Sequence, residues 1–193
     1  PPFYFLPLRI MYQNSLKLRS MLSVLAFILF GISMHAQEKG IVIRNDSGVE
    51  NHIIFGSSFI DALHDFQQLW GPPESRDSVS VLYVNKTFQG IKFDKIELGF
   101  QRVDSLGLFN QARFYRTCPN KFQAIRQMKT LADRLGEIYP VSYDEEEDGT
   151  PFYKGGCAPT GMDDLFTIFV APCKGKWTCQ LRYGAFRYVH VPV

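Results

Sequence analysis

The sequence predicts an α+β fold of two tandem α-β-β-β repeats, with an antiparallel sheet and the helices packed on one face. Three observations carry this prediction. Two amphipathic helical stretches each reach a glycine, three strand-like runs follow the first of them, and apolar positions recur between the two halves of the chain.

The first 36 of the 193 residues are typical of an export signal. Lys17 and Arg19 precede an apolar run, 21–34, and the small residue Ala36 follows it. The run is shorter than the roughly 20 apolar residues that span a bilayer as a helix. We therefore expect cleavage after Ala36 and no stable membrane span, with a retained anchor as the alternative. Residues 1–10 are expected to lie upstream of the true start.

The charge of the chain changes once this region is set aside. Of the 21 basic side chains, Arg9, Lys17 and Arg19 lie in residues 1–36, which leaves 18 against 19 acidic side chains in 37–193. A nearly neutral domain lacks the positive charge typical of nucleic-acid binding. We expect a periplasmic or secreted protein that binds no nucleic acid.

The first helix is predicted within 57–73, "SSFIDALHDFQQLWGPP". Ser57 and Ser58 are candidate N-caps, and the apolar side chains occupy one half of a helical wheel. The glycine and two prolines at 71–73 end the helix. His64 points away from the apolar half, so we interpret it as a surface residue rather than a catalytic one.

Strands and a second helix follow. Three runs rich in apolar and aromatic residues, at 78–84, 93–100 and 107–116, are predicted strands, and 121–139 is a second amphipathic helix.

The two halves can be aligned. The stretch Gln111-Ala112-Arg113-Phe114 matches Gln180-Leu181-Arg182-Tyr183 at a shift of 69 residues. We predict a first repeat within 37–117 and a second within 118–193. Chance alignment of amphipathic patterns is the alternative.

This order of elements resembles the tandem helix-plus-three-strand architecture of the β-lactamase inhibitor protein family, and each half resembles the small outer-membrane assembly lipoproteins. The stretches that carry the resemblance are "LWGPP", "VSVLYV" and "FDKIELGF", and it covers residues 57–188. It implies a secreted binding protein and does not identify the partner. The chain departs from the lipoproteins because no cysteine stands near the end of the apolar run.

All four cysteines lie in the second half, where an oxidising compartment permits disulfides. Cys173 and Cys179 flank a turn in "CKGKWTC", which favours their pairing and leaves Cys118 with Cys157. The sequence alone allows all three connectivities. Zinc binding is an alternative, but the chain has no C-x-x-C spacing.

The acidic run "DEEEDG" is a weak calcium candidate. Asp144, Glu146 and Asp148 occupy positions one, three and five of a calcium loop, but position twelve is Gly155 instead of glutamate. We prefer a solvated loop, and the sequence predicts no cofactor.

The tail "LRYGAFRYVHV" and the turn before it interleave basic and aromatic residues, a composition favoured at protein interfaces. The candidate binding residues are Trp177, Arg182, Tyr183, Arg187 and Tyr188. The alternative is an ordinary last strand, with these residues in its core and rim.

The function predicted from these features is non-catalytic binding of a protein or peptide in the bacterial cell envelope, on an open face of the sheet. No G-x-S-x-G, H-E-x-x-H or phosphate-binding loop occurs after residue 36, so no catalytic residue is predicted. The alternatives are a small secreted hydrolase with its site at the repeat interface and a self-associating envelope component.

Overall fold

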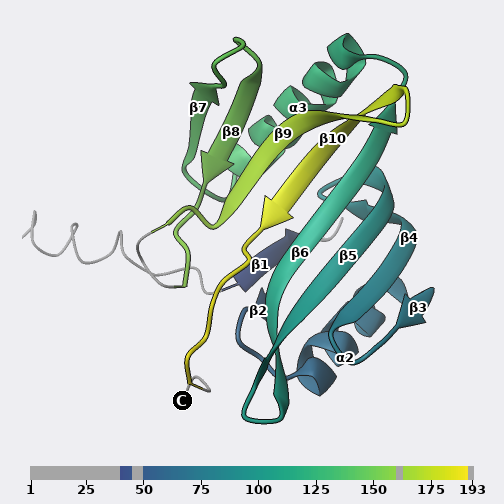
Figure 1. Cartoon of the computed structure of the whole chain (residues 1–193), viewed down its shortest axis with the longest axis vertical. Helices are drawn as coiled ribbons and strands as arrows, with labels where there is room; N and C mark the ends of the chain where they lie inside the picture. Colours follow the sequence, from purple (N-terminus) through teal and green to yellow (C-terminus); the bar gives the residue numbers. More distant parts are fainter. Residues whose placement is uncertain (1–39, 45–49, 160–162, 191–193) are drawn as a thin grey trace, which may run out of the picture. The chain divides into compact units, whose positions relative to one another are not determined.

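The computed structural model describes residues 40–44, 50–159 and 163–190, which all belong to the unit Gln37–Val193. This part of the chain has an α+β fold with two helices, a two-stranded sheet and an eight-stranded antiparallel sheet (Figure 1). The predicted export signal, 1–36, lies outside the described residues.

The first helix, α2 (Phe59–Trp70), begins and ends where its sequence predicts. The side chain of Ser58 caps it by accepting a hydrogen bond from the backbone N of Asp61, at 3.2 Å. Gly71 ends it with a φ of 74°, a conformation that suits glycine. The Nε1 of Trp70 donates to the backbone oxygen of Thr87, at 3.0 Å, and so ties the end of the helix to the sheet.

The eight-stranded sheet has the order β3-β4-β5-β6-β10-β9-β8-β7, so that β6 and β10 pair at its centre (Figure 1). The three strands predicted at 78–84, 93–100 and 107–116 correspond to longer strands in the structure, β4, β5 and β6, and the short strand β3 was not predicted. The strands are β3 (Ser75–Arg76), β4 (Ser80–Phe88), β5 (Ile91–Val103), β6 (Leu106–Cys118), β7 (Val141–Glu145), β8 (Pro151–Gly155), β9 (Phe166–Cys173) and β10 (Lys176–Tyr183).

The second helix, α3 (Lys121–Gly136), packs against β9 and β10. Asn120 caps it by accepting from the backbone N of Gln123, at 2.9 Å. Its apolar stripe is buried at Ala124, Met128, Leu131, Ala132 and Leu135. The helix ends three residues before the predicted limit of 139, because Tyr139 leaves the helix to enter the core.

Aromatic rings form a continuous series of contacts through the core, from Trp70 at the end of α2 to Tyr139 after α3. The ring of Trp70 lies 6.3 Å from that of Phe114, and Phe114 lies 6.1 Å from Tyr183. Tyr183 and Tyr139 both contact Phe166, each with ring centres 5.4 Å apart. Phe114, Phe166 and Tyr183 are almost completely buried, so β6, β9 and β10 share one apolar core.

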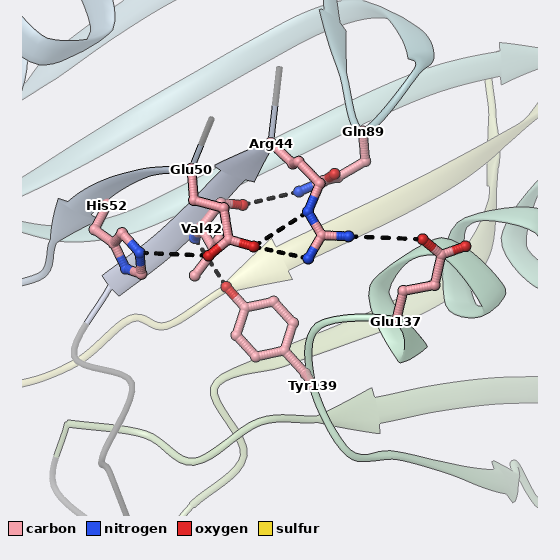
Figure 2. Close-up of polar contacts among 7 residues, drawn as sticks. All are labelled: Val42, Arg44, Glu50, His52, Gln89, Glu137 and Tyr139. Atoms are coloured by element: carbon pink, nitrogen blue, oxygen red, sulfur yellow. Dashed lines mark hydrogen bonds and ion pairs between the residues drawn. The ribbon is translucent and has the colours of Figure 1, made fainter. Parts of the chain in front are cut away.

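A two-stranded hairpin that the sequence analysis did not predict completes this core. It consists of β1 (Gly40–Arg44) and β2 (Glu50–Ile54). The backbone N of Val42 donates to Tyr139 Oη at 2.9 Å, and Gln89 Nε2 donates to the backbone oxygen of Val42 at 2.8 Å (Figure 2). Two side chains distant in the sequence thereby satisfy the backbone N–H and C=O of Val42, in the middle of the edge of β1 that does not pair with β2.

Charged side chains form ion pairs at the exposed end of the hairpin. Arg44 forms an ion pair with Glu50 at 2.7 Å and a longer one with Glu137 at 3.9 Å, and His52 lies 3.9 Å from Glu50 (Figure 2). All four side chains are exposed, and exposed pairs of this kind contribute at most about 1 kcal/mol each. The hairpin is therefore held mainly by the buried contacts of Val42 and its neighbours.

The predicted disulfides are wrong, because all four cysteines are free. The two-residue turn at Lys174 and Gly175 pairs Cys173 with Lys176, whereas Cys179 lies opposite Val170. Side chains alternate between the faces of a strand, so Cys173 and Cys179 lie on opposite faces.

The predicted bond between Cys118 and Cys157 is excluded in this structure by the order of the strands. Cys118 is buried at the end of β6, and Cys157 is exposed just after β8. Strands β10 and β9 lie between β6 and β8 in the sheet.

Thiol labelling tests this correction. In the folded protein, the exposed Cys157 and Cys173 should react with an alkylating reagent. Cys118 and Cys179 should react only after unfolding, because both are buried and burial raises the pKa of Cys179 to about 12. Mass spectrometry without prior reduction should find two labels in buffer and four in denaturant. Fewer than four labels in denaturant would indicate a disulfide.

Substitution of Tyr139 tests the hairpin contact. Tyr139→Phe removes the hydroxyl that accepts from the buried N–H of Val42, and is expected to lower the free energy of unfolding by about 1–3 kcal/mol. Tyr143→Phe is the control, because Tyr143 is exposed and bonds only to the neighbouring Glu145 in the described structure; its effect should be within about 0.5 kcal/mol. Urea denaturation measures both, and equal effects would contradict the contact.

Candidate functional site

The two central strands divide their side chains between a buried face and a polar face. Phe114 on β6 and Leu181 and Tyr183 on β10 are buried. Because side chains alternate, Arg113 and Arg182 point to the opposite side. We call this side the polar face; on strands β5, β6, β9 and β10 it carries Lys95, Glu97, Gln111, Arg113, Tyr115, Phe169, Gln180 and Arg182.

A small hollow of about 130 Å³ lies on the polar face over β6, β10 and β9. It spans three adjacent strands, and aromatic and cationic side chains meet in it. The residues that line it are Arg113, Tyr115, Phe169, Gln180, Leu181 and Arg182.

Glu97 is the centre of a polar network beside the hollow. Lys95 Nζ lies 2.6 Å from one of its carboxylate oxygens, and Tyr115 Oη donates to the other at 2.9 Å. The Lys95 ammonium also lies 4.9 Å from the centre of the Tyr115 ring. Partial burial alone would raise the pKa of Glu97, but the hydrogen bonds from Lys95 and Tyr115 and the charges of Lys95 and Arg113 together lower it.

Arg113 and Arg182 lie directly opposite each other where β6 pairs with β10. In the amide orientation that satisfies both groups, the Gln111 oxygen accepts from Nε and Nη2 of Arg113, at 2.9 Å each. The ion pairs within the described part of the chain include neither arginine. The two arginines thus face each other in the middle of the sheet, and neither forms an ion pair with a carboxylate of the described residues, although the charge of Arg113 helps to lower the pKa of Glu97.

The structure does not gather the five binding residues predicted from the tail. Tyr183 is buried among aromatic rings, and Trp177, on the same side of β10, is partly buried with Lys121 Nζ 5.3 Å from its ring centre. Arg187 is exposed after the end of β10, and the backbone of Tyr188 forms two hydrogen bonds with Gln101.

Arg182 is the one member of that set on the polar face. Its neighbours there, Arg113, Tyr115 and Phe169, were missed by the sequence analysis. A signal for Arg113 was present, because the match between 111–114 and 180–183 aligns it with Arg182. Strand alternation would then have put both arginines on the side opposite Phe114 and Tyr183.

The three calcium candidates, Asp144, Glu146 and Asp148, do not come together around one site. Asp144 pairs with Lys154 at 3.4 Å, and Asp148 accepts from the backbone N of Thr150 at 2.8 Å. The backbone N of Glu146 donates to the Thr150 oxygen and closes a turn. The described residues contain no group of three or more His, Cys, Asp or Glu side chains arranged to hold a metal ion.

The histidines with described contacts lie at the surface. His64 contacts Asp65 and Gln68 on the exposed side of α2, which agrees with its predicted orientation. His52 lies beside Glu50 on the hairpin.

No family model matches the sequence, and no curated protein or solved structure matches it either. Among the helices of the described residues, none is long and apolar enough to cross a membrane.

The network at Glu97 predicts a pH dependence. A carboxyl whose pKa is lowered in the folded state stabilises the fold above its ordinary pKa, and this contribution is lost as the pH falls through the lowered value. The difference in free energy of unfolding between the wild type and Glu97→Gln should therefore be largest near neutral pH and shrink on acidification. Denaturation over a pH series measures it.

A second variant checks the cause of this dependence. Tyr115→Phe removes one donor to Glu97 and should weaken the acid-side slope without abolishing it. A difference between the wild type and Glu97→Gln that is constant with pH would show that the network does not hold the carboxylate in its charged form.

Proposed function

We propose that this protein binds another protein or a peptide on the polar face of its eight-stranded sheet and performs no catalysis there. The observation that carries the proposal is the hollow on this face, where Tyr115 and Phe169 lie beside Arg113 and Arg182. Aromatic and arginine side chains are the residue types enriched in the energetic centres of protein interfaces. A hollow this small suits one side chain of a protein partner better than it suits a small substrate, which is normally enclosed by about 300–1,000 Å³.

The proposal includes a duplicated architecture with both helices on one side of the sheet. The strand order supports it, because β3-β4-β5-β6 is followed by β10-β9-β8-β7, the same succession reversed. The ring contacts of Phe114 and Tyr183 support a shared helical side, since they connect Trp70 of α2 with the core beside α3. Such an arrangement leaves the polar face uncovered.

Export to the periplasm or the cell exterior is a further part of the proposal. It is supported by Lys17 and Arg19 before the apolar run 21–34. The partner would then be a protein or peptide of the cell envelope or its surroundings.

Affinity capture tests the proposed face. The tagged protein is incubated with extract of its host, and bound proteins are identified for the wild type and for Tyr115→Ala/Phe169→Ala. Removal of two aromatic anchors should reduce recovery of a specific partner at least about tenfold, since truncation of one such anchor costs about 2 kcal/mol or more. Circular dichroism checks that the variant is folded.

The matched control is Phe122→Ala/Tyr143→Ala, which removes two exposed aromatic side chains from α3 and β7. It should capture the partner as the wild type does. Partners that are lost from the control but retained by the polar-face variant would contradict the proposal.

A further inference from the structure

We infer that the polar face recognises an acidic side chain of its partner, with Arg113 and Arg182 as paired anchors for one carboxylate. This inference rests on the proposed function, because it concerns the same face. It adds the chemistry of the group that binds at the centre.

The two arginines are placed so that one anion could contact both. They lie directly opposite each other on β6 and β10, where the Cβ atoms of facing residues are typically about 5 Å apart. Like charges at such positions work against strand pairing. A carboxylate between them would remove this repulsion, and the planar guanidinium groups match its two oxygens.

The charges around the two arginines leave Arg182 open to an external anion. Arg182 faces Thr167 on β9, which carries no charge. Glu97 faces Arg113 on β5, but its two oxygens already accept from Tyr115 and contact Lys95. The described structure therefore leaves Arg182 without an acidic neighbour in register, so the positive charge there is open to an anion from outside.

The size and walls of the hollow indicate the kind of anion. A volume of about 130 Å³ admits one side chain and is too small for most whole ligands. Tyr115 and Phe169 flank Gln180 in register and supply partly buried aromatic surface. Exclusion of water by such surface strengthens a charged hydrogen bond. An Asp or Glu with apolar neighbours fits these features.

A nucleic acid fits the features of the hollow less well than an acidic side chain does. Backbone binding to nucleic acid uses an extended row of basic residues. The centre of the polar face instead has two arginines, next to Glu97, in a region 37–193 that is nearly neutral.

The experiment uses a display library of random short peptides as the probe. Peptides are selected on three forms of the protein: the wild type, Arg113→Gln/Arg182→Gln, and the control Arg102→Gln/Arg126→Gln. The control removes the same two charges from exposed positions on β5 and α3. The wild type and the control should enrich Asp or Glu beside apolar residues, and the first variant should lose this enrichment. Urea denaturation checks that all three forms are folded.

A synthetic pair of peptides then measures the carboxylate itself. The best selected peptide is compared with its Asp→Asn or Glu→Gln counterpart. On the wild type, the amide peptide should bind at least about tenfold more weakly, as expected for loss of a charge-assisted hydrogen bond. On Arg113→Gln/Arg182→Gln the two peptides should bind nearly equally, because the coupling between carboxylate and arginines is gone.

Several results would overturn the inference. Absence of any enriched acidic residue, equal binding of acid and amide peptides to the wild type, or the same loss in the control would each do so. Binding of a single-stranded oligonucleotide that depends on both arginines, in place of acidic peptides, would replace the carboxylate by a phosphate backbone.

The proposed function can be judged separately. If selected peptides lose binding to Tyr115→Ala/Phe169→Ala but show no acidic preference, the face is a binding surface and only the inference fails. If they bind that variant unchanged, both fail.

Discussion

The antiparallel pairing of β6 with β10 joins the two halves of the chain into one eight-stranded sheet. It runs in register from Cys118 opposite Trp177 to Ala112 opposite Tyr183. This register puts the rings of Phe114 and Tyr183 into the common core and the two arginines on the other side. A slip by one residue would exchange the faces, so the core and the polar face depend on the same pairing.

Burial of apolar side chains stabilises this register by more than the repulsion between the two arginines destabilises it. Burial of a side chain the size of Phe114 or Tyr183 contributes about 1.5–3 kcal/mol. An unfavourable pair of facing side chains on a sheet costs only about 0.2–1 kcal/mol. The apolar side can therefore hold Arg113 against Arg182 although the two repel each other. A stable core therefore tolerates, on the opposite face, a charge arrangement that does not itself favour folding.

Local signals in the sequence predicted the helices and strands better than the long-range contacts between them. The cap at Ser58 and the stop at Gly71 located α2, whereas the hairpin depends on Tyr139 and Gln89, which reach Val42 across 97 and 47 residues. The proposed disulfide followed the short spacing of "CKGKWTC" and neglected the alternation of side chains along β10. The composition of the tail and of the turn before it indicated Arg182 as a candidate binding residue, but it gave no signal for Arg113, which faces Arg182 from β6.

A map of amide chemical-shift changes is the most direct test of the polar face as a binding surface. The isotope-labelled protein is titrated with the partner obtained by affinity capture, and NMR follows each backbone amide. If the polar face binds the partner, the largest changes should centre on Arg113, Tyr115, Phe169 and Arg182, in the middle of β6, β9 and β10. Largest changes on α2, α3 or the β1–β2 hairpin, with the central strands unaffected, would contradict binding at this face.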